Sequence, residues 1–209
     1  MKPNDSASKT KRLQEKQSAK KREVARHMLA VLADLGFARL NLREVAARSG
    51  TSLGIIHYYF KDKNALLIYS LQLYKEGFNS ELEELIAAAA SAEELLITTV
   101  GVLSRVVEGT GHTHRLWFDL RTQALFDPAF GPVSDEIESD LIGLTGRFLD
   151  KFSRLGGRAL ALDAESLYLM IDGMTRYYLQ QHLAGNTGAG KRLADRLFHI
   201  FERENPSAV

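Results

Sequence analysis

Proline is scarce in this chain, and its placement limits the fold more than any other feature of the sequence. The 209 residues contain four prolines, Pro3, Pro128, Pro132 and Pro206. Residues 4–127 therefore lack the residue that breaks helix interiors most strongly. Apolar residues recur at helical spacing, and the alternation of strands bounded by tight turns is absent. The sequence predicts an all-α protein.

Glycine, proline and polar segments divide the chain into about nine helices. The expected helices cover residues 18–35, 42–49, 53–60, 64–90, 92–108, 115–126, 133–155, 163–184 and 191–204. Gly36 is placed to end the first helix, and Gly50 supplies the turn between the second and the third. Asn41, with Glu44 three residues later, and Ser52 are typical of helix N-caps. Two short helices joined by a tight turn are therefore expected over residues 42–60.

Charge is distributed unevenly along the chain. The first 63 residues hold 14 Lys and Arg against 6 Asp and Glu, and the remainder holds 13 against 20. A basic module on an acidic body indicates that one end meets a polyanion. A solvated, Lys-rich tail is the alternative explanation. We expect a basic flexible arm over residues 1–17, a basic module over 18–63 and a helical body over 64–209.

Several classes of protein are disfavoured by what the sequence lacks. The chain has no cysteine, so disulfides, thiolate metal sites and cysteine nucleophiles are excluded. It has no apolar run long enough for a membrane span and no signal-peptide pattern, so we expect a cytoplasmic protein. His112 and His114 have no third ligand at metal-binding spacing. No phosphate loop or catalytic motif occurs, and we expect no active site, cofactor or metal.

The segment 41–67 fits a helix-turn-helix, in which a short second helix enters the major groove of DNA. Its sequence, NLREVAARSGTSLGIIHYYFKDKNALL, resembles the N-terminal signature of the TetR family of transcriptional regulators. The resemblance covers about residues 20–67, and the remainder is similar only in architecture. His57 departs from it, because the family most often has Tyr there. Gly54-Ile55-Ile56 and Asp62-Lys63-Asn64 are similar to choline-responsive members.

The resemblance implies which residues of the module face DNA. Candidates for contact with bases are Arg43, Leu53, Ile55, His57 and Tyr58, and candidates for contact with phosphates are Thr51, Ser52, Tyr59 and Lys63. Among them, Arg43 is the residue type that pairs with guanine in a bidentate manner. Packing against the first helix is the alternative role for the two tyrosines.

The C-terminal body is predicted to hold a dimer interface and a ligand pocket. Helices 163–184 and 191–204 carry more apolar surface than one neighbouring helix would cover, so we expect a homodimer. The interface candidates are Leu167, Ile171, Met174, Tyr178, Leu193, Leu197, Ile200 and Phe201. The ligand-binding candidates are Tyr69, Leu73, Trp117, Arg121 and Tyr177, an apolar enclosure with a few polar anchors. Packing in the core of one subunit is the alternative role for both sets.

The resemblance, together with the order of the helices, implies a homodimeric transcriptional regulator that represses from a pseudo-palindromic operator in double-stranded DNA. A small-molecule effector, which the sequence does not identify, is expected to release it by binding the DNA-incompetent form more tightly. The operator sequence, the sign of regulation and the regulated genes are also left open. An effector-independent architectural or activator protein is the main alternative, and an all-α enzyme is a further one.

Overall fold

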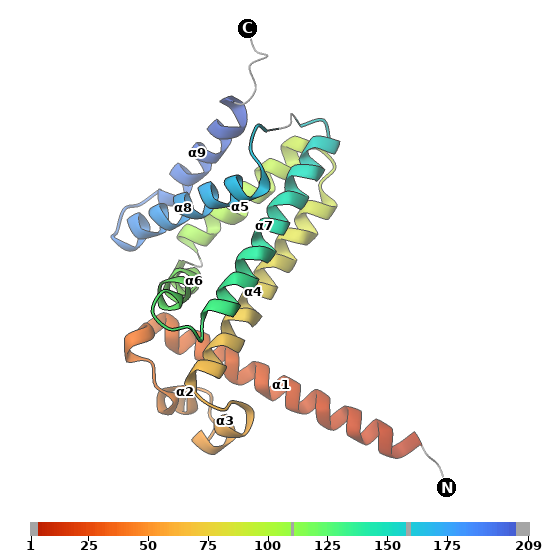
Figure 1. Ribbon diagram of the computed structural model, residues 1–209, viewed down its shortest axis with the longest axis vertical. Coiled ribbons are helices and arrows are strands. Elements are labelled where there is room, and N and C mark those ends of the chain that lie inside the picture. The colour runs from red at the N-terminus through yellow and green to blue at the C-terminus, as the bar shows by residue number, and fades with distance from the viewer. Residues whose placement is uncertain (1–3, 110, 158–159, 204–209) are drawn as a thin grey trace. The chain divides into compact units, whose positions relative to one another are not determined.

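The described part of the chain is almost entirely helical. The computed structural model describes residues 4–109, 111–157 and 160–203, which contain nine α-helices and one short 3₁₀-helix (Figure 1). The elements are α1 (Asn4–Leu35), η1 (Phe37–Arg39), α2 (Leu42–Arg48), α3 (Leu53–Tyr59), α4 (Lys63–Ala88), α5 (Ala92–Glu108), α6 (Gly111–Ala124), α7 (Gly131–Arg154), α8 (Ala164–Leu183) and α9 (Ala189–Arg203). The expected all-α class is confirmed.

The main departure from the expected helices is at the N-terminus. Helix α1 begins at Asn4, although the apolar periodicity predicted a start near residue 18. Residues 4–17 are polar and lack an apolar face, so periodicity gives no sign of a helix there. Helix α6 also begins earlier than expected, at Gly111, and η1 was not predicted.

The chain separates into two compact units, one up to Tyr74 and one from Lys75 onward. Helix α4 contributes to both of them. Within the described residues, no helix is both long enough and apolar enough to cross a membrane.

The N-terminal unit is built by helix caps around an apolar centre. Asn41 Oδ1 accepts a hydrogen bond from the Glu44 backbone N–H at 2.9 Å, and Ser52 Oγ accepts one from the Ile55 N–H at 3.2 Å. These bonds satisfy backbone donors that the first turns of α2 and α3 leave free. Gly50 has φ +59° between the two helices, a conformation that disfavours residues with a Cβ. The predicted helix pair and its turn are confirmed.

The C-terminal unit is a bundle of helices with two apolar clusters. One joins the second half of α4 to α5 and α7, with Leu82, Leu95 and Phe148 at its centre. In Figure 1, α7 runs beside that part of α4. The other joins α5 to α9, where Leu193 and Leu197 are buried. This packing leaves an internal cavity among the helices of the unit.

Candidate nucleic-acid interface and internal cavity

Helix α3 has one buried face and one exposed face. Ile56 is fully buried, and Phe60, directly after the helix, is 4% exposed. The exposed face of α3 consists of Gly54, Ile55, His57 and Tyr58. Tyr58 is 70% exposed, so its ring is available to a partner and does not serve the core. A two-turn helix with such a face has the form of a groove-reading helix.

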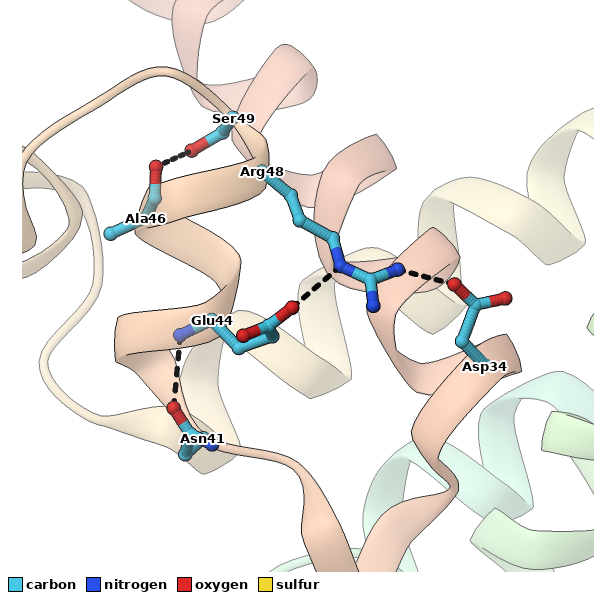
Figure 2. A network of polar contacts seen from close by, with 6 residues as sticks. All are labelled: Asp34, Asn41, Glu44, Ala46, Arg48 and Ser49. Atoms are coloured by element: carbon cyan, nitrogen blue, oxygen red, sulfur yellow. Dashed lines mark hydrogen bonds and ion pairs between the residues drawn. The ribbon is translucent and has the colours of Figure 1, made fainter.

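Helix α2 places one arginine outward and ties the other to α1. Arg43 is exposed. Arg48 forms an ion pair with Asp34 on α1, and its Nε donates to Glu44 Oε1 at 2.8 Å (Figure 2). Both bonds favour the charged form and raise the pKa of Arg48. Arg48 therefore braces α2, whereas Arg43 is the arginine of α2 that can turn to a ligand.

The other DNA-binding candidates differ in how available they are. The Ser52 hydroxyl is exposed and already accepts the capping bond, whereas the Thr51 hydroxyl is buried without a hydrogen-bond partner among the described residues. Lys63 is partly buried, with Nζ 5.8 Å from the centre of the Phe37 ring. Leu53 is partly buried too. The hydroxyl group of Thr51 is therefore less accessible to a partner than that of Ser52.

The tyrosine pair is held in place by aromatic and polar contacts. Tyr58 and Tyr59 meet edge to face, with ring centres 5.0 Å apart, and Tyr59 is partly buried. Gln17 Nε2 on α1 donates to the Tyr58 hydroxyl at 3.2 Å. Sequence reasoning missed Gln17, because it treated residues 1–17 as a flexible arm. These contacts orient Tyr58 on the exposed face of α3.

The C-terminal unit encloses a largely apolar cavity. About 820 Å³ of space, including its open mouth, lies between the lining atoms. The wall is built from α4 to α9 and includes Phe78, Leu82, Leu141, Phe148 and Trp117. Such a wall suits a mainly hydrocarbon ligand.

A few polar groups interrupt this apolar wall. Lys75, His114, Tyr168, Asp172 and Thr175 all line the cavity. Among the described residues, the Thr175 hydroxyl is buried without a hydrogen-bond partner, and the buried Trp117 Nε1 and Tyr168 hydroxyl lie close to each other but form no hydrogen bond of full geometry. Buried polar atoms usually have hydrogen-bond partners. These three atoms therefore mark the part of the wall where a bound molecule can supply the missing hydrogen bonds.

Lys75 is the most unusual of these residues, because its side chain is buried among aromatic rings. The residue is 3% exposed, and Nζ lies 4.8 Å from the ring centre of Phe78 and 5.0 Å from that of Trp117. Burial lowers the pKa of Lys75 to about 7; the negative charge of Asp172 opposes this shift and Arg121 adds to it. The Lys75 ammonium group therefore loses its proton much more readily than that of an ordinary lysine.

Arg121 neutralises the acidic group on the cavity wall. Its Nη1 lies 2.5 Å from Asp172 Oδ2, and its Nε lies 2.7 Å from Glu138 Oε1. Burial acts to lower the pKa of Arg121, but the charge of Asp172, its hydrogen bond and the charge of Glu138 together outweigh burial, so the pKa is raised. Burial is also the main reason that the pKa of Tyr168 is raised. Asp172 thus already has a hydrogen-bonded cation, and Lys75 has only the electrostatic influence of that carboxylate.

The ligand candidates named from the sequence are only partly brought together. Trp117 lines the cavity, and Arg121 acts on it through Asp172. Tyr69 and Leu73 belong to the N-terminal unit and are not among the lining residues, and Tyr177 is 54% exposed. Sequence reasoning missed Lys75, His114, Asp172 and Thr175. A charged residue on a predicted apolar helix face is the signal that was available for Lys75 and Asp172.

The histidine pair is placed differently from the sequence interpretation. His114 lies on α6, which begins before the expected start at residue 115, and it is 5% exposed between the rings of Phe78 and Phe118. Burial and the charge of Lys75 lower its pKa to about 3, so the imidazole is neutral. The side chain of His112 lies outside the described residues. No cluster of potential metal ligands occurs among the residues that are described.

Three of the interface candidates already have partners inside one subunit. Leu167, Leu193 and Leu197 are at most 1% exposed, so they are core residues and not surface residues. Their apolar periodicity could not distinguish a neighbouring helix of the same chain from one of a second chain. The other candidates, all partly buried, are Ile171, Met174, Tyr178, Ile200 and Phe201. The exposed face of α8 contains Leu169, Gly173, Arg176, Tyr177 and Gln180.

Comparisons with known proteins agree with this arrangement. Residues 29–69 match the family model described as bacterial regulatory proteins, tetR family. The HTH-type transcriptional regulator PksA of Bacillus subtilis is 22% identical, covering 83% of this chain and 85% of that protein. The HTH-type transcriptional regulator BetI of Cronobacter sakazakii is 26% identical, covering 81% of this chain and 82% of its own length.

Solved structures extend the likeness over the C-terminal unit. A transcriptional regulator from Saccharomonospora viridis, crystallised in complex with choline, has a TM-score of 0.75 at 18% identity. The alignment covers 88% of this chain and 96% of that chain. The matched segment contains the capped helix pair α2–α3. The similarity to the two HTH-type regulators named above extends over about four-fifths of this chain. Residues 29–69 therefore form a helix-turn-helix segment of the tetR family type, and over most of its length the chain is similar to HTH-type transcriptional regulators.

Proposed function

We propose that this regulator is a homodimeric repressor that binds a pseudo-palindromic operator through α2 and α3 and leaves it when a small molecule occupies the cavity. One observation carries the proposal: the same chain has an outward-facing, capped helix pair in one unit and a lined cavity in the other. A protein that only bound DNA would have no need for such a cavity.

The DNA contact is assigned to a small set of side chains. Arg43 supplies the fork that pairs with guanine, and His57 and Tyr58 add hydrogen-bonding groups at base edges. Leu53 and Ile55 have only apolar contact with thymine methyl groups to offer. Ser52, Tyr59 and Lys63, with Thr51 if its hydroxyl turns outward, hold phosphates and thereby set the register.

Dimerisation is assigned to the exposed face of α8. Leu169 is 53% exposed and Tyr177 is 54% exposed, so the face carries large apolar side chains in solvent. A second copy of the same face would cover both of them in a two-fold interface. The partly buried Ile171, Met174, Tyr178, Ile200 and Phe201 would gain further burial at its edges. Two α3 helices would then meet half-sites one DNA turn, or a multiple of it, apart.

Release requires that the effector prefer the form that does not bind DNA. A ligand with equal affinity for both forms shifts nothing, however tightly it binds. Helix α4 begins at Lys63, beside the DNA-binding segment in sequence, and continues to residues that line the cavity. The choline complex of the similar Saccharomonospora viridis structure supports a small-molecule site in this architecture.

Selection of bound sequences from random duplex DNA tests the central claim. The expected outcome is an inverted repeat, because two copies related by a two-fold axis read two identical half-sites. Recovery of a single unrepeated half-site would refute the dimeric mode of binding. A metabolite panel, scored by release of the selected duplex, then tests the effector. An intact complex in the presence of every compound that binds the protein would refute the release mechanism.

A further inference from the structure

We propose that the cavity is selective for amphipathic monocarboxylates, whose carboxylate binds Lys75 Nζ while the hydrocarbon body lies along the apolar wall. The inference rests on the proposed function, because it names the chemical class of the effector for that site. It follows from the position of one buried ammonium group that has no bonded partner among the described residues, in an otherwise mostly apolar cavity.

Lys75 is a cation that lacks a bonded counter-ion. Its ammonium group forms no hydrogen bond and no ion pair with any residue that the structure describes, and two aromatic rings flank it. An ammonium group removed from water is costly unless an anion and hydrogen-bond acceptors compensate for it. A ligand carboxylate provides both, so this position favours an anionic head group.

With Lys75 protonated, the charges of Lys75, Asp172, Arg121 and Glu138 sum to zero, and Lys75 is the one among them without a bonded partner. Asp172 on α8 faces Lys75 but is already bonded to Arg121 on α6, which also pairs with Glu138 on α7. His114 on α6 is neutral and adds no second cation. One ammonium group matches one carboxylate, whereas a doubly charged phosphate ester would bury a charge without compensation. A quaternary ammonium ligand would place a second cation beside Lys75.

Hydrogen-bond donors are available for the carboxylate oxygens. The hydroxyl groups of Thr99 and Thr175 line the cavity, and among the described residues these two groups have no partner. A carboxylate has about four acceptor positions, so it can accept from Lys75 and from such donors together. Phe78, Leu82, Ile86, Leu144 and Phe148 supply the apolar wall for the rest of the molecule.

Three ten-carbon probes separate the possible head groups. Decanoate, decanol and decyltrimethylammonium share a hydrocarbon body, and each is titrated below its micelle concentration at pH 6.5. The readout is the fluorescence of Trp117, which is the only tryptophan of the chain and lines the cavity. We expect decanoate to bind roughly ten- to a hundredfold more tightly than decanol. Equal affinities, or tightest binding of the cation, would overturn the inference.

Removal of the ammonium group tests its role. In Lys75→Met, decanol should bind as before while the preference for decanoate disappears. Lys191→Met is the matched control, because Lys191 is exposed and pairs with Asp195 at the surface; it should keep the full preference. A preference for decanoate that survives in Lys75→Met would contradict the assignment.

The wild-type protein gives a test that does not depend on a folded variant. Because a bound carboxylate favours the ammonium form, decanoate binding at pH 8 should take up protons. Titration calorimetry in two buffers of different ionisation enthalpy measures this uptake. Binding without proton uptake would count against Lys75 as the partner.

The ligand class and the proposed function fail in different ways. If none of the three probes binds but another molecule releases the selected duplex, the carboxylate inference is wrong and the repressor mechanism stands. If decanoate binds with the expected selectivity but the duplex stays bound, the ligand class stands and the release mechanism is wrong.

Discussion

At the scale of single residues, the N-terminal unit buries some side chains of its short helices and exposes others. Ile56 and Phe60 are buried, whereas Tyr58 is mostly exposed. Likewise, Arg48 is bonded to Asp34 and Glu44, and Arg43 is exposed. Substitutions at the exposed positions should therefore change DNA binding without unfolding the unit.

Replacement of Arg43 by alanine tests this division. A bidentate contact with guanine is worth about 1–3 kcal/mol, so Arg43→Ala should weaken binding to the selected duplex by that amount and relax the preference at one base pair. Fluorescence anisotropy at fixed salt measures the affinity. Arg196→Ala, on the exposed surface of α9, is the control and should bind as the wild type does. Unchanged affinity in Arg43→Ala would remove this residue from the interface.

The buried Lys75 should make stability depend on pH. Its pKa is about 7 in the folded chain and near 10.5 when unfolded, so between these values the unfolded state binds more protons. The free energy of unfolding should therefore rise from pH 7 to pH 10, by up to about 4 kcal/mol. Urea unfolding of wild type and Lys75→Met at several pH values isolates this contribution. Parallel pH profiles of the two proteins would contradict it.

At the scale of elements, the approach of α9 to α5 depends on a glycine. The Gly190 N–H donates to Glu108 Oε1 at 2.8 Å, and a Cβ at this position would lie 2.7 Å from the Ser104 carbonyl oxygen. That distance is too short for any side chain, and the obstructing atom belongs to backbone. The two helices can pack this closely only because residue 190 has no side chain.

Substitution of Gly190 by alanine should therefore destabilise the C-terminal unit. Overpacking of this kind costs about 1–3 kcal/mol. Gly77→Ala on α4 is the matched control: a Cβ there meets nothing within 4 Å, so it should stabilise the helix by up to about 1 kcal/mol. Chemical unfolding of both variants gives the two values. A Gly190→Ala protein with an unchanged free energy of unfolding would show that α9 can move away from α5 without loss of stability.

At the scale of the whole molecule, DNA affinity should depend on the pairing of subunits. Tyr177→Arg places a charge on the exposed face of α8 and should yield monomers. Because a dimer binds its second half-site intramolecularly, the loss of operator affinity should be roughly a hundredfold or more. Light scattering and anisotropy measure the two effects. Ile97→Arg, at another exposed apolar residue, should leave both unchanged. A dimeric Tyr177→Arg protein would place the interface elsewhere.

The all-α class and most of the element boundaries followed from local patterns. Asn41 and Ser52 cap their helices as their residue types predict, and the glycine at position 50 takes the left-handed conformation expected of a turn. The exposed face of α3 also follows, because the core position Ile56 fixes the orientation of a helix of two turns. The start of α1 did not follow, because a helix without an apolar face carries no periodic signal.

Tertiary packing decided which side chains face the cavity and which face solvent. Capping and periodicity depend on residues a few positions apart, so they can be read along the chain. The placement of Lys75 beside Asp172 and Trp117 depends on α4, α6 and α8, which are brought together only by folding. The burial of Leu193 inside one subunit was likewise decided by folding. An apolar stripe has the same sequence pattern whether it packs within one subunit or against another.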